Sequence, residues 1–143
     1  MPADVPPGWP AEVQPPGSED FAASAIAWLF NVVPPGYRDS DIYARWPAAL
    51  AALARHHSQA SVTGARQGYR VVRTELGGEI PPHAIDSVLS AYRIEGKRLA
   101  ATARAVELVE HALRRALREA GPGPRVLTRP VANRPAPSLA PAN

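Results

Sequence analysis

Five residues have side chains that suit a metal ion: His56, His57, Glu107, Glu110 and His111. On a helix, Glu107 and His111 share one face and could present two ligands to one ion, since they stand four residues apart. The ferritin-like di-iron pattern is Glu-x-x-His, which is one position shorter. In an antiparallel helix pair His57 would face about residue 101, roughly 9 Å along the axis from Glu107. We therefore expect a polar Glu–His face, assign no metal ligand or cofactor, and keep a ferritin-like metal-binding protein as the second alternative.

A second group of residues is basic and suits phosphate. Its members are Arg66, Arg70, Arg73, Arg93 and Lys97. In a helical hairpin they would lie near the turn and form a candidate nucleic-acid surface. Acidic residues interleave with them and weaken its field. These are Glu75, Glu79, Asp86 and Glu95. Only Tyr69 and Tyr92 stand nearby for base stacking, so a solvated helix face is the competing interpretation.

Catalytic motifs are missing from the chain. It has no cysteine, no Gly-x-Ser-x-Gly, no phosphate-binding glycine loop and no His-Glu-x-x-His. The net charge of +3 is mild, and fifteen of the sixteen basic residues are arginine, which is typical of a high-GC genome. The apolar run from Phe21 to Val33 is too short for a bilayer, which needs roughly 20 residues, and the N-terminus lacks the pattern of a secretory signal. We expect a cytoplasmic protein that is not an enzyme and has no membrane span.

Two long helices must position these groups. Pro47 and Pro82 suit first helical positions, and Gly121 suits a helix end, so the sequence predicts helices over 47–76 and 82–120 around the turn from Leu76 to Pro82. Apolar or small residues recur along the second helix in three- and four-residue steps, which predicts a coiled-coil seam. The seam consists of Ile85, Leu89, Tyr92, Gly96, Leu99, Ala103, Val106, Glu110, Leu113 and Leu117. A turn centred near residue 79 would place Gly96 opposite Val62 and Leu99 opposite Gln59, with Gly64 and Gly68 near the point of close approach.

Glu110 interrupts this seam with a charge. A buried polar residue at such a position can fix register or oligomeric state. Alternatively, the seam opens where the segment around Trp46 packs, with Glu110 facing Ala48. We favour this second interpretation.

The remaining segments are shorter and rich in proline. Residues 1–17 form an extended arm, in which Trp9 either anchors the arm to the helices or is presented to a partner; we favour the anchor. Three Pro-Pro-Gly triplets, ending at Gly8, Gly17 and Gly36, predict type II turns. Ser18 is a candidate cap for a helix over 19–32, and Asp39 or Ser40 for a short helix over 41–45. The sequence predicts one helical domain over 18–120 and a disordered tail over 121–143.

Two stretches carry a resemblance. Pro-Gly-Trp-Pro at Pro7 to Pro10 and Ala-Trp-Leu at Ala27 to Leu29 resemble small all-helical proteins of high-GC actinobacteria, over most of Val5 to Leu117. That resemblance implies a helical fold and brings no function. The helical-hairpin substrates of specialised secretion carry Trp-x-Gly at their turn, whereas this chain has Leu76-Gly77-Gly78.

These observations predict an all-α fold, in which a long antiparallel helical hairpin carries a shorter N-terminal helix in a small bundle. The predicted function is a non-enzymatic protein–protein interaction or scaffolding protein that self-associates through surplus coiled-coil face. The candidate contact residues are Trp9, Leu99, Val106 and Leu113. The first alternative is a nucleic-acid-associated accessory protein that uses the basic residues near the turn.

Overall fold

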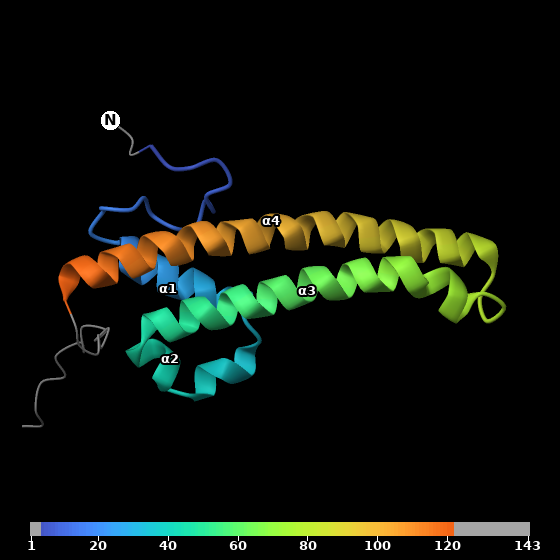
Figure 1. Ribbon diagram of the computed structural model, residues 1–143, viewed down its shortest axis with the longest axis horizontal. Helices are drawn as coiled ribbons and strands as arrows, with labels where there is room; N and C mark the ends of the chain where they lie inside the picture. Colours follow the sequence, from blue (N-terminus) through green and yellow to red (C-terminus); the bar gives the residue numbers. More distant parts are fainter. Residues whose placement is uncertain (1–3, 122–143) are drawn as a thin grey trace, which may run out of the picture.

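The computed structural model describes residues 4–121, and the regular secondary structure of this part of the chain consists of helices, without a β-strand (Figure 1). Its elements are α1 (Phe21–Val32), the 3-10 helix η1 (Pro35–Asp39), α2 (Ile42–Arg45), α3 (Pro47–Leu76) and α4 (Pro82–Ala120). The all-α prediction is confirmed. The predicted tail, 121–143, lies outside the described residues except for Gly121.

The hairpin of α3 and α4 has the predicted bounds. Each helix begins at a proline, where the missing N–H has no intrahelical partner to lose. The backbone N–H groups of Glu79 and Ile80 both donate to the carbonyl of Leu76 and close the turn. Gly78 at this turn and Gly121 after α4 have φ near +90°, which glycine adopts without steric cost.

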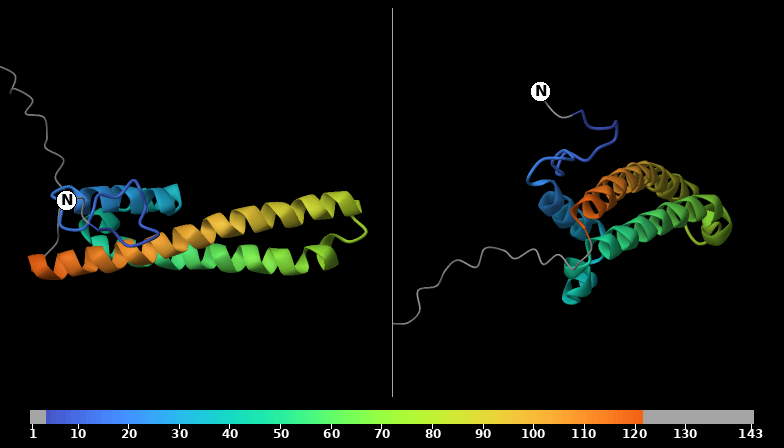
Figure 2. Two further views of the ribbon diagram at one scale, coloured as in Figure 1. Left: turned by 90° about the horizontal axis from the view of Figure 1, so that it is seen from above. Right: turned by 60° about the vertical axis from the view of Figure 1, so that its left-hand side comes forward.

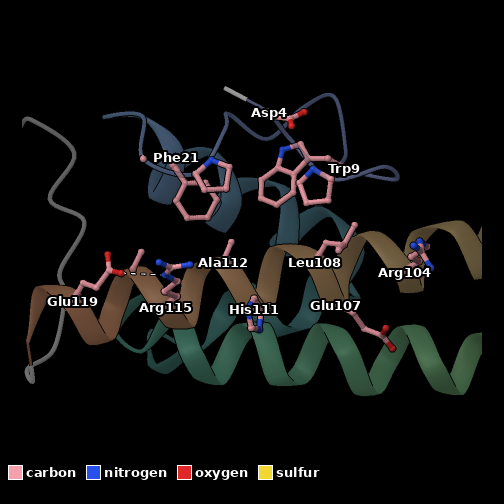
Figure 3. Close-up of a pocket in the computed structure, with 14 residues that line it drawn as sticks. Asp4, Trp9, Phe21, Arg104, Glu107, Leu108, His111, Ala112, Arg115 and Glu119 are labelled. Atoms are coloured by element: carbon pink, nitrogen blue, oxygen red, sulfur yellow. Dashed lines mark hydrogen bonds and ion pairs between the residues drawn. The ribbon is translucent and has the colours of Figure 1, made fainter. Parts of the chain in front are cut away.

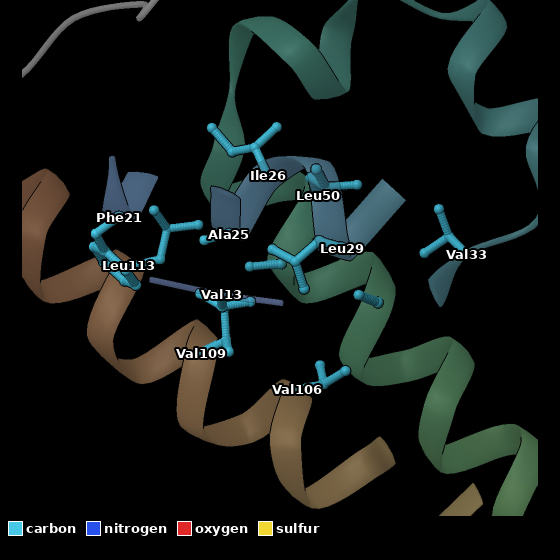
Figure 4. Packing of buried hydrophobic residues seen from close by; sticks show 12 residues of the cluster. Val13, Phe21, Ala25, Ile26, Leu29, Val33, Leu50, Val106, Val109 and Leu113 are labelled. Carbon is cyan, nitrogen blue, oxygen red and sulfur yellow. The ribbon is translucent and has the colours of Figure 1, made fainter. Parts of the chain in front are cut away.

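α1 packs on the end of the hairpin that lies away from the turn, and it stops short of the turn (Figure 2). Its buried face, Phe21, Ala25 and Leu29, forms one core with residues of α3 and α4 (Figure 4). The hairpin residues of that core are Leu50, Ala51, Ala54, Val106, Val109 and Leu113. Near the turn, a smaller cluster of Val72, Ile85 and Leu89 holds α3 and α4 together. The half of the hairpin away from the turn, which we call the proximal half, is thus part of a three-helix core. The half next to the turn, which we call the distal half, has only two helices.

The N-terminal arm packs against this core. Trp9 donates its indole N–H to the carbonyl of Val13 at 2.9 Å, and its ring centroid lies 6.0 Å from that of Phe21. Val13 is 3% exposed. Trp9 therefore lies where the anchor interpretation places it.

The helices predicted to begin at residues 19 and 41 begin later in the structure, at Phe21 and Ile42. The Ser18 hydroxyl donates to the carbonyl of Pro15 at 2.8 Å instead of capping a helix, and α1 begins at Phe21. Gly8 and Gly17 have the positive φ of the predicted turns. The third triplet was mispredicted, because Gly36 has no positive φ and lies in η1.

The glycine predictions for the hairpin were only partly correct. A Cβ on Gly68 would overlap the phenol ring of Tyr92, so this glycine does mark a close approach. A Cβ on Gly64 would meet nothing within 4 Å, and a Cβ on Gly96 would meet only the Cβ of Ala65, at 4.0 Å, rather than Val62. The register differs because residues 77–80 fold back on Leu76 instead of joining the two helix ends symmetrically.

Candidate functional site

A groove lies open between α3 and α4 in the two-helix half of the molecule. It has a volume of about 500 Å³ and a mostly apolar, small-residue lining. Its lining residues are Ser61, Gly64, Ala65, Val88, Ala91, Tyr92, Glu95 and Leu99, and we call it the distal groove. Small side chains on both helices keep its floor low, so an elongated apolar partner can approach closely.

The distal groove continues the path that α1 follows along the hairpin. A neighbouring hollow is lined by Trp28 and Val32 of α1 together with Ser61 and Leu99. The last two residues also line the distal groove. The end of α1 therefore borders one end of this groove, and the helix stands on the same face of the hairpin.

The distal groove carries one ion pair at its edge, and α4 also has one highly exposed aliphatic side chain outside the groove lining. Arg98 donates to the carboxylate of Glu95 three residues earlier, and this hydrogen bond lowers the pKa of Glu95. Ile94 is 68% exposed, the highest value among the large hydrophobic residues of the described part. The groove offers apolar area and little chemistry, which suits binding rather than catalysis.

The predicted basic residues lie on the same half of the hairpin. Arg93 donates to the hydroxyl of Tyr69 at 3.4 Å, and its guanidinium lies 5.9 Å from the ring centroid. That hydrogen bond lowers the pKa of Tyr69. Arg73 lies 3.8 Å from Asp86, whereas Arg66, Arg70 and Lys97 are exposed and make no ion pair within residues 4–121. Within the described part of the chain, these three cations therefore have no ion-pair partner on this surface.

The residues considered as metal ligands, but not assigned as such, make other contacts. Glu107 accepts from Gln59 at 3.4 Å, and Glu110 pairs with Arg55. His56 is exposed on α3, and His57 lines the hollow beside α1. Among residues 4–121 no three His, Cys, Asp or Glu side chains converge as a metal site would require.

Glu110 lies in the seam for a reason other than the one we favoured. Its side chain is 13% exposed, and Oε1 accepts from Nε of Arg55 at 2.7 Å. Nη2 of Arg114 lies 3.6 Å from Oε2, which is within ion-pair distance but too long for a hydrogen bond. Trp46 is 42% exposed and does not fill this part of the seam. The charge belongs to an interhelical ion pair that joins α3 to α4.

The four predicted contact residues have very different exposures. Val106 and Leu113 are fully buried, because α1 covers that stretch of the seam, and they present no surface to a partner. Leu99 is half-buried in the distal groove. Trp9 is half-buried against the core. Of this set, Leu99 is the residue that the structure brings to the candidate site.

Trp9 also borders a second cavity, a cleft of about 620 Å³ between the arm and α4 (Figure 3). Trp9 and Phe21 face Leu108 and Ala112 across it. Arg104 and Arg115 stand at its two ends, and Arg115 pairs with Glu119 at 3.1 Å. At one end of the cleft the arm backbone passes close to the side chain of Arg104, at Gly8, which has a φ of +93°.

No protein-family model, curated protein or solved structure matches this chain. None of the described helices is long and apolar enough to cross a membrane.

The sequence predicted only part of the distal groove. Tyr92 and Leu99 belong to the predicted seam, and Gly64 was expected to face another backbone. Val88 and Ala91 lie one position before seam residues and were not predicted to form a surface. The sequence signal for this surface is a second set of small and aliphatic residues on the second long helix, such as Val88 and Ala91, one position before the seam residues Leu89 and Tyr92.

Proposed function

We propose that this protein is a non-enzymatic protein–protein interaction module, and that the distal groove is its docking surface. The observation that carries the proposal is the unequal length of the three packed helices. α1 covers the proximal half of the hairpin, and the equivalent path along the distal half is open. A three-helix arrangement that is complete at one end leaves a position for a further helix at the other.

The form of the distal groove favours a helical partner. Its lining on α4 runs from Val88 to Leu99, or roughly 17 Å at 1.5 Å per residue. Helix-in-groove recognition uses an apolar stripe of this length, with anchors spaced three and four residues apart. The small residues on the floor, such as Gly64 and Ala65, suit the close approach of a helix.

A photo-reactive amino acid at Ala91 tests this proposal in the cells that make the protein. Ala91 lines the groove, and Ala100 is an exposed alanine of the same helix outside it. We expect irradiation to give a discrete protein adduct from position 91 and none from position 100. Absence of any adduct at position 91, in a protein with unchanged helical content, would rule out the proposed docking surface.

A second candidate function is nucleic-acid association, and the free cations beside Tyr69 favour it. Arg66, Arg70 and Lys97 are exposed, and Tyr69 is 41% exposed beside Arg93. Binding through such a surface would weaken steeply as salt rises, because each neutralised phosphate releases counterions. The Arg66→Glu and Arg70→Glu double variant would lose this binding, and absence of binding by the wild-type protein at low salt would exclude it.

A further inference from the structure

Exposed aromatic side chains gather on the short elements between α1 and α3, at the end of the hairpin away from its turn (Figure 1). Of the five exposed large hydrophobic residues in the described part of the chain, Tyr37, Ile42 and Trp46 fall within one stretch of ten residues. The ring of Tyr43 belongs to the same cluster, because its centroid lies 5.7 Å from that of Tyr37. We call these four residues the aromatic patch.

The aromatic patch is one surface. The backbone N–H of Trp46 donates to the carbonyl of Ile42 at 2.9 Å, and on this turn Trp46 neighbours both Ile42 and Tyr43, four and three residues earlier. Tyr43 is half-buried against the main core and holds Tyr37 in an edge-to-face contact with an interplanar angle of 85°. Surfaces lined by Tyr and Trp rings bind polyproline II segments, whose extended conformation is largely preformed.

One carboxylate beside the aromatic patch is unbalanced. Asp41 pairs with Arg45 at 2.8 Å, and Arg38 donates to Oδ1 of Asn31 at 2.6 Å, which turns its guanidinium toward α1. Asp39 is exposed and has no ion-pair partner among residues 4–121. The patch therefore favours a ligand that combines proline with arginine, because a guanidinium can pair with a carboxylate and stack on an aromatic ring.

We propose that the aromatic patch binds the segment Arg134-Pro135-Ala136-Pro137 of the same chain. Three basic and no acidic residues follow Gly121, so the net charge of +3 of the whole chain belongs to residues 122–143. A polyproline II helix has three residues per turn, so Arg134 and Pro137 share one face of it and stand roughly 9 Å apart. In the bound segment Arg134 pairs with Asp39, and Pro137 packs on the aromatic rings. This site is separate from the distal groove and does not depend on it.

The segment can reach the aromatic patch from the end of α4. α2 directly precedes α3 and packs against it, and Leu50, in the first turn of α3, shares the main core with Leu113. Gly121 lies eight residues after Leu113, roughly 12 Å farther along the helix axis. Arg134 lies thirteen residues after Gly121, and an extended chain of that length spans up to roughly 43 Å. A short connection gives an effective concentration of about 1 mM, so a segment with millimolar affinity occupies the patch about half of the time.

Paramagnetic relaxation in the full chain tests this contact, because the chain has no cysteine of its own. A nitroxide on Ser138→Cys, next to the segment, should broaden the indole N–H signal of Trp46. Arg134→Asp should reduce this broadening about twofold or more, and so should Asp39→Arg. Combining the two substitutions restores an ion pair of reversed sign and should restore the broadening.

Arg125→Asp is the matched control, because it changes the charge by the same amount outside the segment. It should leave the broadening of Trp46 unchanged. Arg134 lies after α4, so Arg134→Asp removes no contact of the helical core. Equal broadening of Trp46 in the wild type and in Arg134→Asp would overturn the proposal.

A mixed sample separates binding within one chain from binding between chains. It contains isotope-labelled protein without cysteine and an equal amount of unlabelled protein that carries the nitroxide at Ser138→Cys. At about 0.1 mM, tenfold below the effective concentration within one chain, the Trp46 signal should stay sharp. Broadening as strong as within one chain would mean that another copy supplies the segment, and would overturn the intramolecular arrangement. Sharp Trp46 signals in both samples would overturn the proposal as a whole.

Discussion

Nε of Arg55 on α3 lies 2.7 Å from Oε1 of Glu110 on α4, and this ion pair joins the two long helices beside the apolar core. Glu110 occupies a position where the surrounding periodicity has apolar or small residues. The pair is half-buried, so both desolvation and charge attraction contribute to its net effect.

Removal of one partner should be more harmful than removal of both. Arg55→Ala leaves the Glu110 carboxylate, 13% exposed, with only the longer contact to Arg114, and should lower the free energy of unfolding by about 1–3 kcal/mol. The double variant Arg55→Met, Glu110→Leu should regain most of this loss. Urea unfolding at one fixed protein concentration measures both. A double variant that is less stable than Arg55→Ala would show that the pair supplies more than its burial costs.

The two glycines of α3 should respond differently to alanine. Gly64→Ala places a Cβ in open space and should stabilise α3 by about 0.5–1 kcal/mol through helix propensity. Gly68→Ala forces the Tyr92 ring to move and should be less stable than Gly64→Ala by about 1 kcal/mol or more.

Thermal unfolding of both variants measures this difference. Adding Tyr92→Ala removes the ring that Gly68 accommodates, so the difference between the two glycine variants should disappear. A difference that persists without the ring would mean that Gly68 is needed for another reason.

Trp9 should hold the arm, and Trp46 offers a matched control. Trp9→Ala removes the contact with Phe21 and the hydrogen bond to Val13, and should cost about 1–3 kcal/mol. The backbone amides of Val13 and Gln14 should then exchange faster with solvent, since their acceptors lie at Pro10 and Ser24. Trp46→Ala, at a position that is 42% exposed, should leave those amides unchanged. Equal exchange in all three proteins would show that the arm is held by something else.

The Glu95–Arg98 pair predicts a pH dependence with a definite sign. Arg98→Gln removes the hydrogen bond that lowers the pKa of Glu95, so that pKa should rise toward its ordinary value. A carboxyl whose pKa is lower in the folded state stabilises the fold at pH values above its unfolded pKa, and this contribution is lost as pH falls through the folded pKa. The stability difference between wild type and Arg98→Gln should therefore be present at neutral pH and vanish in acid.

Carboxyl carbon NMR titration of Glu95 checks the pKa, and unfolding at several pH values checks the linkage. Arg98→Lys keeps the charge and should retain part of the shift. A Glu95 pKa that is the same in the wild type and Arg98→Gln would contradict the hydrogen bond as its cause.

Helix existence and bounds were predictable here because local residues determine them. Pro47 and Pro82 fix two helix starts, and Gly121 follows α4. The predicted seam includes four of the buried residues of α4, Ile85, Leu89, Val106 and Leu113, but not Ala105 and Val109. The start of α1 was less predictable. The Ser18 hydroxyl could either accept a hydrogen bond from a backbone N–H as a helix cap or donate to the carbonyl of Pro15, and in the structure it donates to Pro15.

The candidate site was not predictable in the same way, because it depends on where α1 stops along the hairpin. The sequence marks Val106 and Leu113 as apolar, but only the packing of Leu29 and its neighbours shows that this part of the seam is already covered. Because α1 does not extend that far, the stretch of α4 around Ala91 stays uncovered. Similarly, the partner of Glu110 depends on the hairpin register, which the turn around Leu76 sets.

The main core joins α1 to α4. Phe21 and Leu29 pack with Val106, Val109 and Leu113, whereas the hairpin near the turn is held by residues close in sequence, such as Val72 and Ile85. During synthesis, α1 and α3 therefore leave the ribosome before the surface that buries them exists. The distal hairpin is the part with short-range contacts, yet the molecule acquires its principal core only after Leu113 has emerged from the exit tunnel.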